Sequence, residues 1–175
     1  MIETRRLILR DWRDADCPAF YAMSADPEVM RYFNQTETPA QCDERLARMR
    51  RWSETLGYTF WAMQRKTDGV IVGHCGLKPL TIPWPEPNDI EIGWMLARDW
   101  WGQGYACEAA AAALDLGLTL APRVIAMTTQ SNVRSWGLMH RLGMERLADL
   151  DFDHPEVPLD NPHRPHIVYG KRRGC

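Results

Sequence analysis

The hydrophobic positions of this chain follow the helical period in some segments and the alternating period of strands in others. Between residues 38 and 54, apolar side chains recur three or four positions apart, as on the buried face of an amphipathic helix. These positions are Cys42, Leu46, Met49 and Trp52. Thr38 precedes Pro39, an order typical of a helix start, so we predict a helix that Thr38 caps.

Stretches rich in β-branched and aromatic residues predict the strands. They cover residues 5–12, 58–64, 70–80, 90–97, 123–129, a run that begins at 144, and 166–171. The pair Asp68-Gly69 lies between the second and third of these runs and is typical of a tight hairpin turn. Those two strands are therefore expected to be antiparallel neighbours.

Two further helices are expected, one after each of the two middle strands. Their predicted limits are residues 104–120, which include five consecutive alanines, and residues 131–143. Ser131 or Asn132 is expected to cap the second helix and Gly143 to end it. A strand-helix-strand-helix order places the two middle strands side by side and parallel, with a right-handed crossover.

Length and composition predict one globular domain over residues 1–175. The chain has 175 residues, of which 45% are hydrophobic and 25% charged, enough to bury a core. Its formal net charge of -2 gives no reason to expect nucleic acid or an anionic membrane as partner. No stretch approaches the roughly 20 apolar residues of a membrane-spanning helix, and the N-terminus has no apolar signal region.

The cysteines form none of the close pairs that disulfide frameworks or zinc sites use. They are Cys17, Cys42, Cys75, Cys107 and Cys175. We therefore expect a reducing, cytoplasmic location and no bound metal.

The segment "WWGQGYACEA", residues 101–110, predicts an anion-binding turn. Gly102 and Gly104 alternate just before the alanine-rich helix, as in a turn whose backbone approaches a ligand closely. Such a turn leaves the first amides of the helix unpaired and directs them, with the positive end of the helix dipole, at a ligand. Phosphate groups bind at such ends, although a turn chosen for its geometry alone is the alternative.

Two common phosphate motifs fit this turn poorly. A dinucleotide fingerprint requires glycine or alanine where Cys107 stands, and a P-loop requires lysine and a hydroxyl residue where Tyr105 and Ala106 stand. The remaining interpretation is a pyrophosphate held by backbone amides alone, as in the binding of coenzyme A.

These features resemble the GNAT acetyltransferases, in particular the branch that contains the ribosomal-protein N-terminal acetyltransferases RimJ and RimL. The glycine motif of the family falls on residues 101–106, with Trp101 in place of the usual glutamine or arginine. Further matches are the opening "TRRLILR", the strand "IEIGWML", and the pair Asn132 and Ser135 ahead of "LGM". The matches span nearly the whole chain in the order of the family.

The resemblance implies a mixed α/β fold, with a twisted sheet of about seven strands and about four helices. The sheet would split into a V between its fourth and fifth strands, residues 90–97 and 123–129, with acetyl-coenzyme A in the opening. Backbone groups of residues 94–96 would pair with the pantetheine arm, while the tryptophans are expected to pack in the core. The implied cofactor-binding residues are Trp94, Met95, Leu96, Trp101, Gly102, Gln103, Gly104, Tyr105, Ala106, Asn132 and Ser135.

Acetyl transfer to an amine requires a group that accepts the proton of the amine. Glu91 lies on the strand beside the expected thioester, with its side chain on the face opposite to Ile90 and Ile92. A partly desolvated carboxylate among apolar residues has a raised pKa and accepts a proton, directly or through water. Glu91 is therefore the candidate base, and an edge carboxylate paired with an arginine is the alternative.

The departing thiolate requires a proton or a hydrogen bond. Many members of the family use a tyrosine on the helix after the fifth strand, and this chain has none between Arg123 and Gly143. The resemblance puts Ser135 in that place, either as a hydrogen-bond donor while water supplies the proton or without a role. Asn132 would bond the pantetheine amide or only cap its helix.

The expected acceptor is a primary amine of low pKa, most plausibly the α-amine of a protein or peptide. An α-amine, with a pKa of about 7.7 to 8.0, is substantially neutral at cytoplasmic pH, whereas a lysine near 10.4 is not. The loop at 151–166 adds acidic residues that would attract a cationic amine, unless it is a rigid connection without substrate contact. These residues are Asp151, Asp153, Glu156 and Asp160.

The sequence leaves three alternatives open. In the first, the acceptor is a small-molecule amine. In the other two, the chain is a non-catalytic acyl-coenzyme A sensor or a purely structural domain. Both a monomer and a homodimer are compatible with the sequence.

Overall fold

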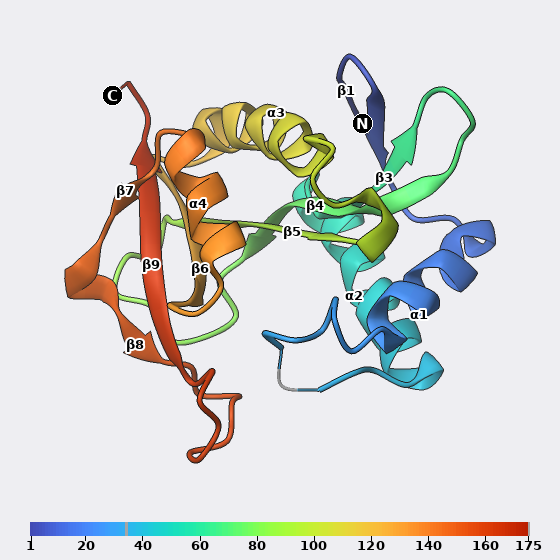
Figure 1. Ribbon diagram of the computed structural model, residues 1–175. Helices are drawn as coiled ribbons and strands as arrows, with labels where there is room; N and C mark the ends of the chain where they lie inside the picture. The colour runs from blue at the N-terminus through green and yellow to red at the C-terminus, as the bar shows by residue number, and fades with distance from the viewer. Residues whose placement is uncertain (34, 175) are drawn as a thin grey trace.

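One sheet of nine strands runs through the computed structural model, in the order β1-β2-β3-β4-β5-β6-β9-β7 with β8 beside β9 (Figure 1). The structure describes residues 1–33 and 35–174, so the expectation about Cys175 lies outside it. The strands are β1 (Ile2–Glu3), β2 (Leu7–Arg10), β3 (Phe60–Arg65), β4 (Ile71–Pro79), β5 (Ile90–Leu96), β6 (Arg123–Thr129), β7 (Glu145–Arg146), β8 (Phe152–Asp153) and β9 (Pro165–Arg172). Only β5 and β6 pair in parallel within these residues.

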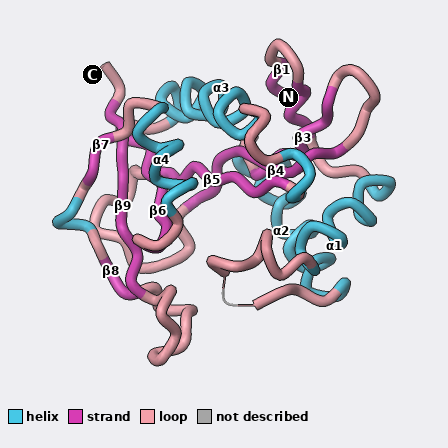
Figure 2. The backbone as a smooth tube through the Cα atoms, viewed as in Figure 1, coloured by secondary structure: helices cyan, strands magenta, loops and turns pink. Residues whose placement is uncertain are grey.

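Helices cover both faces of the sheet (Figure 2). They are α1 (Cys17–Ala25), α2 (Pro39–Leu56), α3 (Tyr105–Leu120) and α4 (Val133–Arg141), with short 3-10 turns at Asp14–Asp16, Arg98–Trp100 and Ala148–Leu150. Buried residues of α3 and α4 share one core cluster with Ile92, whereas those of α1 and α2 share the other with Met95. Side chains alternate between the two faces along a strand, so Ile92 and Met95, three positions apart on β5, point to opposite faces. The two helix pairs therefore lie on opposite sides of the sheet.

The predicted elements are present, and the sheet has two more strands than expected. Three of the nine strands are only two residues long. The Thr38 side chain accepts a hydrogen bond from the Gln41 amide, so the predicted cap of α2 is confirmed. The Asp68-Gly69 turn joins the antiparallel pair β3 and β4, and Asn132 rather than Ser131 is the N-cap of α4.

The sheet opens between β5 and β6, as expected. Only Ile90 and Glu91 of β5 have partners in β6, whereas β5 stays paired with β4 through Leu96. β6 is paired with β9 over its whole length, from Arg123 to Thr129. In Figure 1, β5 accordingly runs across the molecule, away from the upright β6 and β9. The two halves of the sheet therefore diverge after the first residues of β5.

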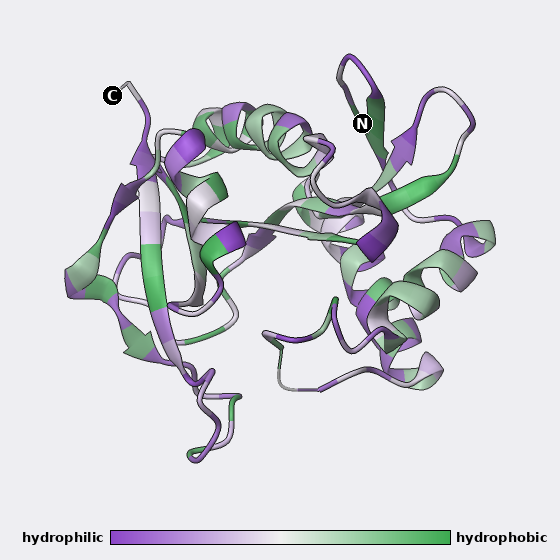
Figure 3. Cartoon of the chain, in the orientation of Figure 1, coloured by the Kyte–Doolittle hydropathy of each residue, from purple (hydrophilic) through white to green (hydrophobic). Residues whose placement is uncertain are grey.

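The described cysteines Cys17, Cys42, Cys75 and Cys107 are free. Over residues 1–33 and 35–174, no helix combines the length and the apolar character needed to cross a membrane. Figure 3 shows hydrophobic stretches on α3 and polar colour on the long loop between β8 and β9.

His74 is a buried polar side chain in the core beneath α1 and α2. Its residue is 5% exposed, and among the described residues neither ring nitrogen has a hydrogen-bond partner. The ring stacks on Phe60 with centroids 5.4 Å apart. Burial lowers the pKa of His74 well below 6.5, and repulsion from Arg45 adds to that shift. The imidazole is therefore neutral in the folded protein at neutral pH.

Replacing His74 with leucine should remove an acid-sensitive component of stability. The unfolded chain takes up a proton at this site below about pH 6.5 and the folded chain does not, so wild-type stability falls as the pH falls. The difference in unfolding free energy between His74→Leu and the wild type should therefore grow in favour of the variant by about 1.4 kcal/mol as the pH falls from 6 to 5. Urea unfolding at pH 7, 6 and 5 measures the difference. Parallel slopes for His74→Leu and the wild type would contradict the prediction.

Candidate functional site

The edge of β5 that faces the opening carries free backbone groups. The Ala97 amide donates to the Val72 carbonyl of the β4 side at 3.0 Å. Because backbone groups alternate in direction along a strand, those of Met95 also face β4. The amides and carbonyls of Trp94 and Leu96 therefore face the opening. Of the three residues expected to pair with pantetheine, Trp94 offers its amide and carbonyl to a ligand in the position of an added strand. Leu96 offers its amide, because its carbonyl already accepts a hydrogen bond from the Trp101 indole.

The glycine turn follows this edge and presents unpaired amides. Gly102 and Gly104 have φ values of 73° and 80°, in the left-handed region that favours glycine. Residues 102–104 are exposed, and α3 begins at Tyr105. Among the described residues, the amides from Gly102 to Cys107 have no acceptor, and the next amide donates to the Gly104 carbonyl. An anion in front of α3 would meet these donors together with the positive end of the helix dipole.

The turn is fastened to both of its neighbours. The Trp101 indole Nε1 donates to the Leu96 carbonyl at 2.8 Å, which ties the turn to the free edge of β5. The Arg6 guanidinium donates to the Gln103 carbonyl at 3.0 Å and forms an ion pair of 2.6 Å with Glu108 in the first turn of α3. These contacts fix the direction of the free amides.

Two arginine side chains lie beside the turn, although the sequence analysis did not single them out. Arg134 lies over the Trp101 ring at 4.9 Å, and Arg6 lies over the Tyr105 ring at 4.4 Å. Arg134 is exposed at the start of α4. The charge of Arg6 is offset by Glu108, whereas Arg134 adds positive charge beside the turn, which favours an anionic ligand.

Asn132 and Ser135 lie at the N-terminus of α4. The Asn132 side-chain oxygen accepts from the Ser135 amide at 3.3 Å, and its nitrogen donates to the Thr128 hydroxyl at 3.1 Å. Asn132 thus caps the helix, and its side chain is used within the protein. The Ser135 hydroxyl is half-buried and has no hydrogen-bond partner among the described residues, so it is free to bond a ligand.

Glu91 is buried on the face of the sheet that carries α1 and α2, opposite to Ile90 and Ile92. Its carboxylate forms an ion pair with the Lys78 ammonium at 2.7 Å. Burial raises the pKa of Glu91 above its usual value, and the charge of Lys78 acts in the opposite direction. The expected desolvated carboxylate is present, and its partner is a lysine rather than an arginine.

The sequence did not predict the role of Lys78, because its ion pair with Glu91 depends on the register of the two strands. The residue lies directly opposite Glu91 in the antiparallel pair of β4 and β5. The connection between these strands is long and rich in proline, so no tight-turn signal fixes the register.

Aromatic and histidine rings gather on the same side of the sheet, near the long loop after β8. Phe152 contacts Trp84, His154 and His166 at centroid distances of 5.8, 5.8 and 5.7 Å. The ring of Tyr32, from the connection between α1 and α2, meets His163 at 5.6 Å. Two segments distant in sequence therefore meet beside the opening.

The acidic residues expected to attract a cationic amine are partly neutralised. Asp151 is paired with Arg146, and Asp153 lies 3.4 Å from Arg164. Two of the four carboxylates in the loop therefore have a positive partner, which weakens the predicted attraction of the loop for a cation.

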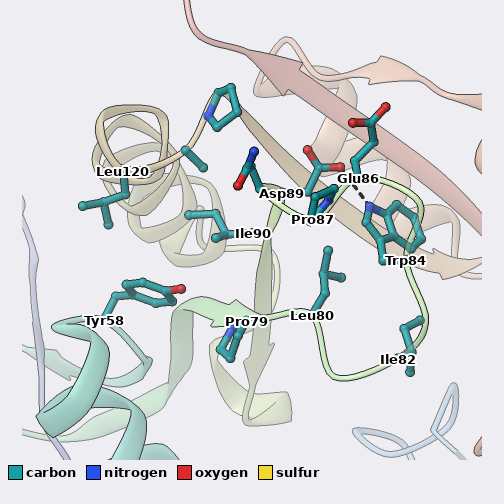
Figure 4. Close-up of a pocket in the computed structure, with 13 residues that line it drawn as sticks. Tyr58, Pro79, Leu80, Ile82, Trp84, Glu86, Pro87, Asp89, Ile90 and Leu120 are labelled. Atoms are coloured by element: carbon teal, nitrogen blue, oxygen red, sulfur yellow. Dashed lines mark hydrogen bonds between the residues drawn. The ribbon is translucent and has the colours of Figure 1, made fainter.

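A cavity of about 450 Å³ lies at the other end of β5, away from the glycine turn. Figure 4 shows its lining, with Tyr58, Trp84, Ile90 and Leu120 around it. Neither the free amides nor Glu91 line this cavity. Across residues 1–33 and 35–174, no cluster of three histidine, cysteine or acidic side chains is arranged to hold a metal ion.

Known proteins resemble this chain in sequence and in fold. Residues 6–145 match a family model described as an acetyltransferase (GNAT) domain. The uncharacterized protein YkkB of Bacillus subtilis is 33% identical over 144 residues, which cover 81% of this chain and 83% of YkkB. A GNAT-family acetyltransferase from Bacillus anthracis has a TM-score of 0.80 at 24% identity, with 98% of both chains covered. RimL, the ribosomal L7/L12 α-N-protein acetyltransferase, in complex with coenzyme A, has a TM-score of 0.75 at 13% identity, covering 97% of this chain and 95% of its own.

Proposed function

Because this chain belongs to the GNAT acetyltransferase family, we propose that it transfers an acetyl group from acetyl-coenzyme A to a primary amine, and that the amine is the α-amine of a protein or peptide. The observation that carries the proposal is the set of unpaired amides from Gly102 to Cys107 next to the free edge of β5. The buried carboxylate of Glu91 lies on the same strand. In this proposal the free amides bind the anion, and Glu91, on the strand that leads to them, accepts the proton.

The residues present fit coenzyme A. The amides of residues 102–107 would hold the pyrophosphate, with Arg134 adding positive charge beside it. The backbone of Trp94 and Leu96 would bond the pantetheine amides in the manner of an added strand. The hydrogen bonds of Trp101 and Arg6 that hold the glycine turn support this assignment, because a turn that is already held in place loses little conformational freedom when it binds a ligand.

Glu91 is proposed as the base. When bound, acetyl-coenzyme A supplies the thioester carbonyl that the neutral amine attacks, with loss of the thiolate. The Glu91 carboxylate accepts the proton that the amine nitrogen releases, directly or through water. Its burial among apolar residues suits this role, because a raised pKa brings the carboxyl closer to the working pH. The Ser135 hydroxyl donates a hydrogen bond to the departing sulfur, and water supplies the proton.

The choice of acceptor rests on the small number of catalytic groups in the site. One carboxylate serves as base, and α4 supplies a serine rather than a tyrosine. Such a site favours an amine that is already substantially neutral, and an α-amine is neutral to a far greater extent at pH 7 than a lysine side chain. The pair Asn132 and Ser135 and the likeness of fold to RimL support a place in the RimJ and RimL branch.

Two peptides test the choice of acceptor. One has a free N-terminus and no lysine, and the other has a blocked N-terminus and one lysine. Thiol release from acetyl-coenzyme A at pH 7 to 9 should show kcat/KM at least about tenfold higher for the first, because its amine is neutral at lower pH. Mass spectrometry of the product locates the acetyl group.

A third peptide, with a blocked N-terminus and no lysine, sets the background. Acetylation of the lysine peptide alone would contradict the assignment. So would the failure of both peptides while a polyamine, an amino acid or an aminoglycoside reacts, and the acceptor would then be a small molecule. No thiol release with any amine, despite binding of coenzyme A, would indicate a sensor.

A further inference from the structure

We propose that Lys78 is a positioning residue for acetyl transfer, whose ammonium fixes the Glu91 carboxylate in place and keeps it in the ionised form that accepts the proton. The inference rests on the proposed role of Glu91 as base. It assigns a function to a side chain that contacts neither the glycine turn nor the free edge of β5.

The geometry of the pair is set by the backbone. Lys78 and Glu91 are direct partners in the register of β4 and β5, so their side chains leave the sheet on the same face. The Lys78 Nζ lies 2.7 Å from the Glu91 Oε2, and their side chains are only 21% and 11% exposed. A pair shielded in this way is screened little by salt, and it is an ion pair rather than a directed hydrogen bond, because the Glu91 Oε2 has no hydrogen-bond partner among the described residues.

The other charged groups on this face have partners of their own or are neutral. Asp89, just before β5, is paired with Arg123 at 2.6 Å. On β6, the residue opposite Glu91 is Ile125. Burial lowers the pKa of His154, and repulsion from His166 and Lys78 adds to the shift, so this nearby imidazole is neutral at pH 7. Within the described part of the chain, Lys78 is therefore the positive charge that Glu91 contacts.

Further along the same face of β5, the neighbouring groups are apolar. Gly93, the next residue of β5 on this face, lies beneath the Phe60 ring of β3. Phe60 in turn stacks on His74, whose pKa burial lowers, so this ring is neutral as well. Without Lys78, nothing would offset the desolvation of the carboxylate, and it would bind a proton at higher pH.

Lys78 also has a consequence for the acceptor. Its ammonium repels a second ammonium at the same carboxylate, so an amine that arrives neutral is favoured over one that arrives charged. This is the discrimination expected between an α-amine and the side chain of a lysine.

The test is the pH profile of Lys78→Met. The acid limb of kcat/KM should move up by about one pH unit or more, so that activity on the acid side of the limb falls by about tenfold or more while activity at pH 9 approaches the wild-type value. Lys78→Arg keeps the charge and should restore the wild-type limb. The dissociation constant of coenzyme A and the thermal midpoint, measured in parallel, report on the cofactor site and on folding.

A double variant separates this inference from the proposed function. In the Glu91→Gln background, Lys78→Met should cause no further loss, because Lys78 acts through Glu91. Wild-type activity of Glu91→Gln would refute the base assignment and with it the proposed mechanism. Impaired Glu91→Gln together with an unchanged acid limb in Lys78→Met would overturn the role of Lys78 alone. If Lys78→Met does not fold, Lys78→Gln takes its place under the same criteria.

Discussion

Glu91→Gln is expected to lower kcat by at least about a hundredfold while the dissociation constant of coenzyme A stays within about twofold of the wild-type value. Glutamine keeps the shape of the side chain and loses its capacity to accept a proton. The wild-type kcat/KM should decline as the pH falls through the pKa of Glu91, which burial raises, and this limb should be absent from the variant. Thiol release measures the rate, and calorimetric titration measures the affinity.

Asp16→Asn is the matched control for Glu91→Gln. The Asp16 carboxylate is also buried, at 6% exposure, and is paired with Arg10 at 2.6 Å, but it lies outside the opening. Its loss should lower the thermal midpoint and leave the kcat of the folded protein unchanged. Equal loss of kcat and of coenzyme A affinity in Glu91→Gln would identify a structural carboxylate instead of a base.

Gly104→Val is expected to weaken the binding of coenzyme A by more than about tenfold. Gly104 has a φ of 80°, a conformation that a β-branched residue resists, and it immediately precedes α3. A Cβ atom at this position would lie 3.4 Å from Arg6 Nη2, on the side chain that holds the Gln103 carbonyl. The substitution should therefore disturb the direction of the free amides and the contact of Arg6 with the turn. Fluorescence or calorimetric titration with coenzyme A measures the loss.

Gly57→Val separates backbone strain from loss of the site. Gly57 ends α2 with a φ of 75°, and an added Cβ would meet no atom within 4 Å. This variant should be strained to a similar degree and should bind coenzyme A as the wild type does. Unchanged affinity in a folded Gly104→Val would show that the turn does not hold the cofactor.

Local patterns predicted the elements and much of the candidate site. The Thr38 cap, the Asp68-Gly69 turn and the helix after the glycine turn depend on residues within a few positions of one another, and all three are present. The face on which Glu91 lies also followed from the sequence, because side chains alternate along any strand. These features require no knowledge of which segments meet.

Contacts between distant segments were decided by the tertiary structure. Arg6 contacts the glycine turn and Glu108, which lie about a hundred residues away in the sequence. No local pattern in either segment predicts these contacts. The edge-to-face contact of Tyr32 with His163 likewise joins two loops that no local pattern relates. The pairing of Asp151 and Asp153 with arginines lessened the attraction for cations that was expected of residues 151–166, because the fold brings an arginine to each of these carboxylates.

The sequence by itself therefore determined the elements of this protein, the position of its glycine turn and the buried side of its carboxylate. The tertiary structure alone decided that Lys78 is the partner of that carboxylate and that the buried ring nitrogens of His74 have no hydrogen-bond partner within residues 1–33 and 35–174. The physical reason is the range of the interactions involved. Capping, turn formation and side-chain alternation act over a few residues, whereas strand register across a long loop is fixed by the packing of the whole sheet, and a shift of one residue would move Lys78 to the opposite face.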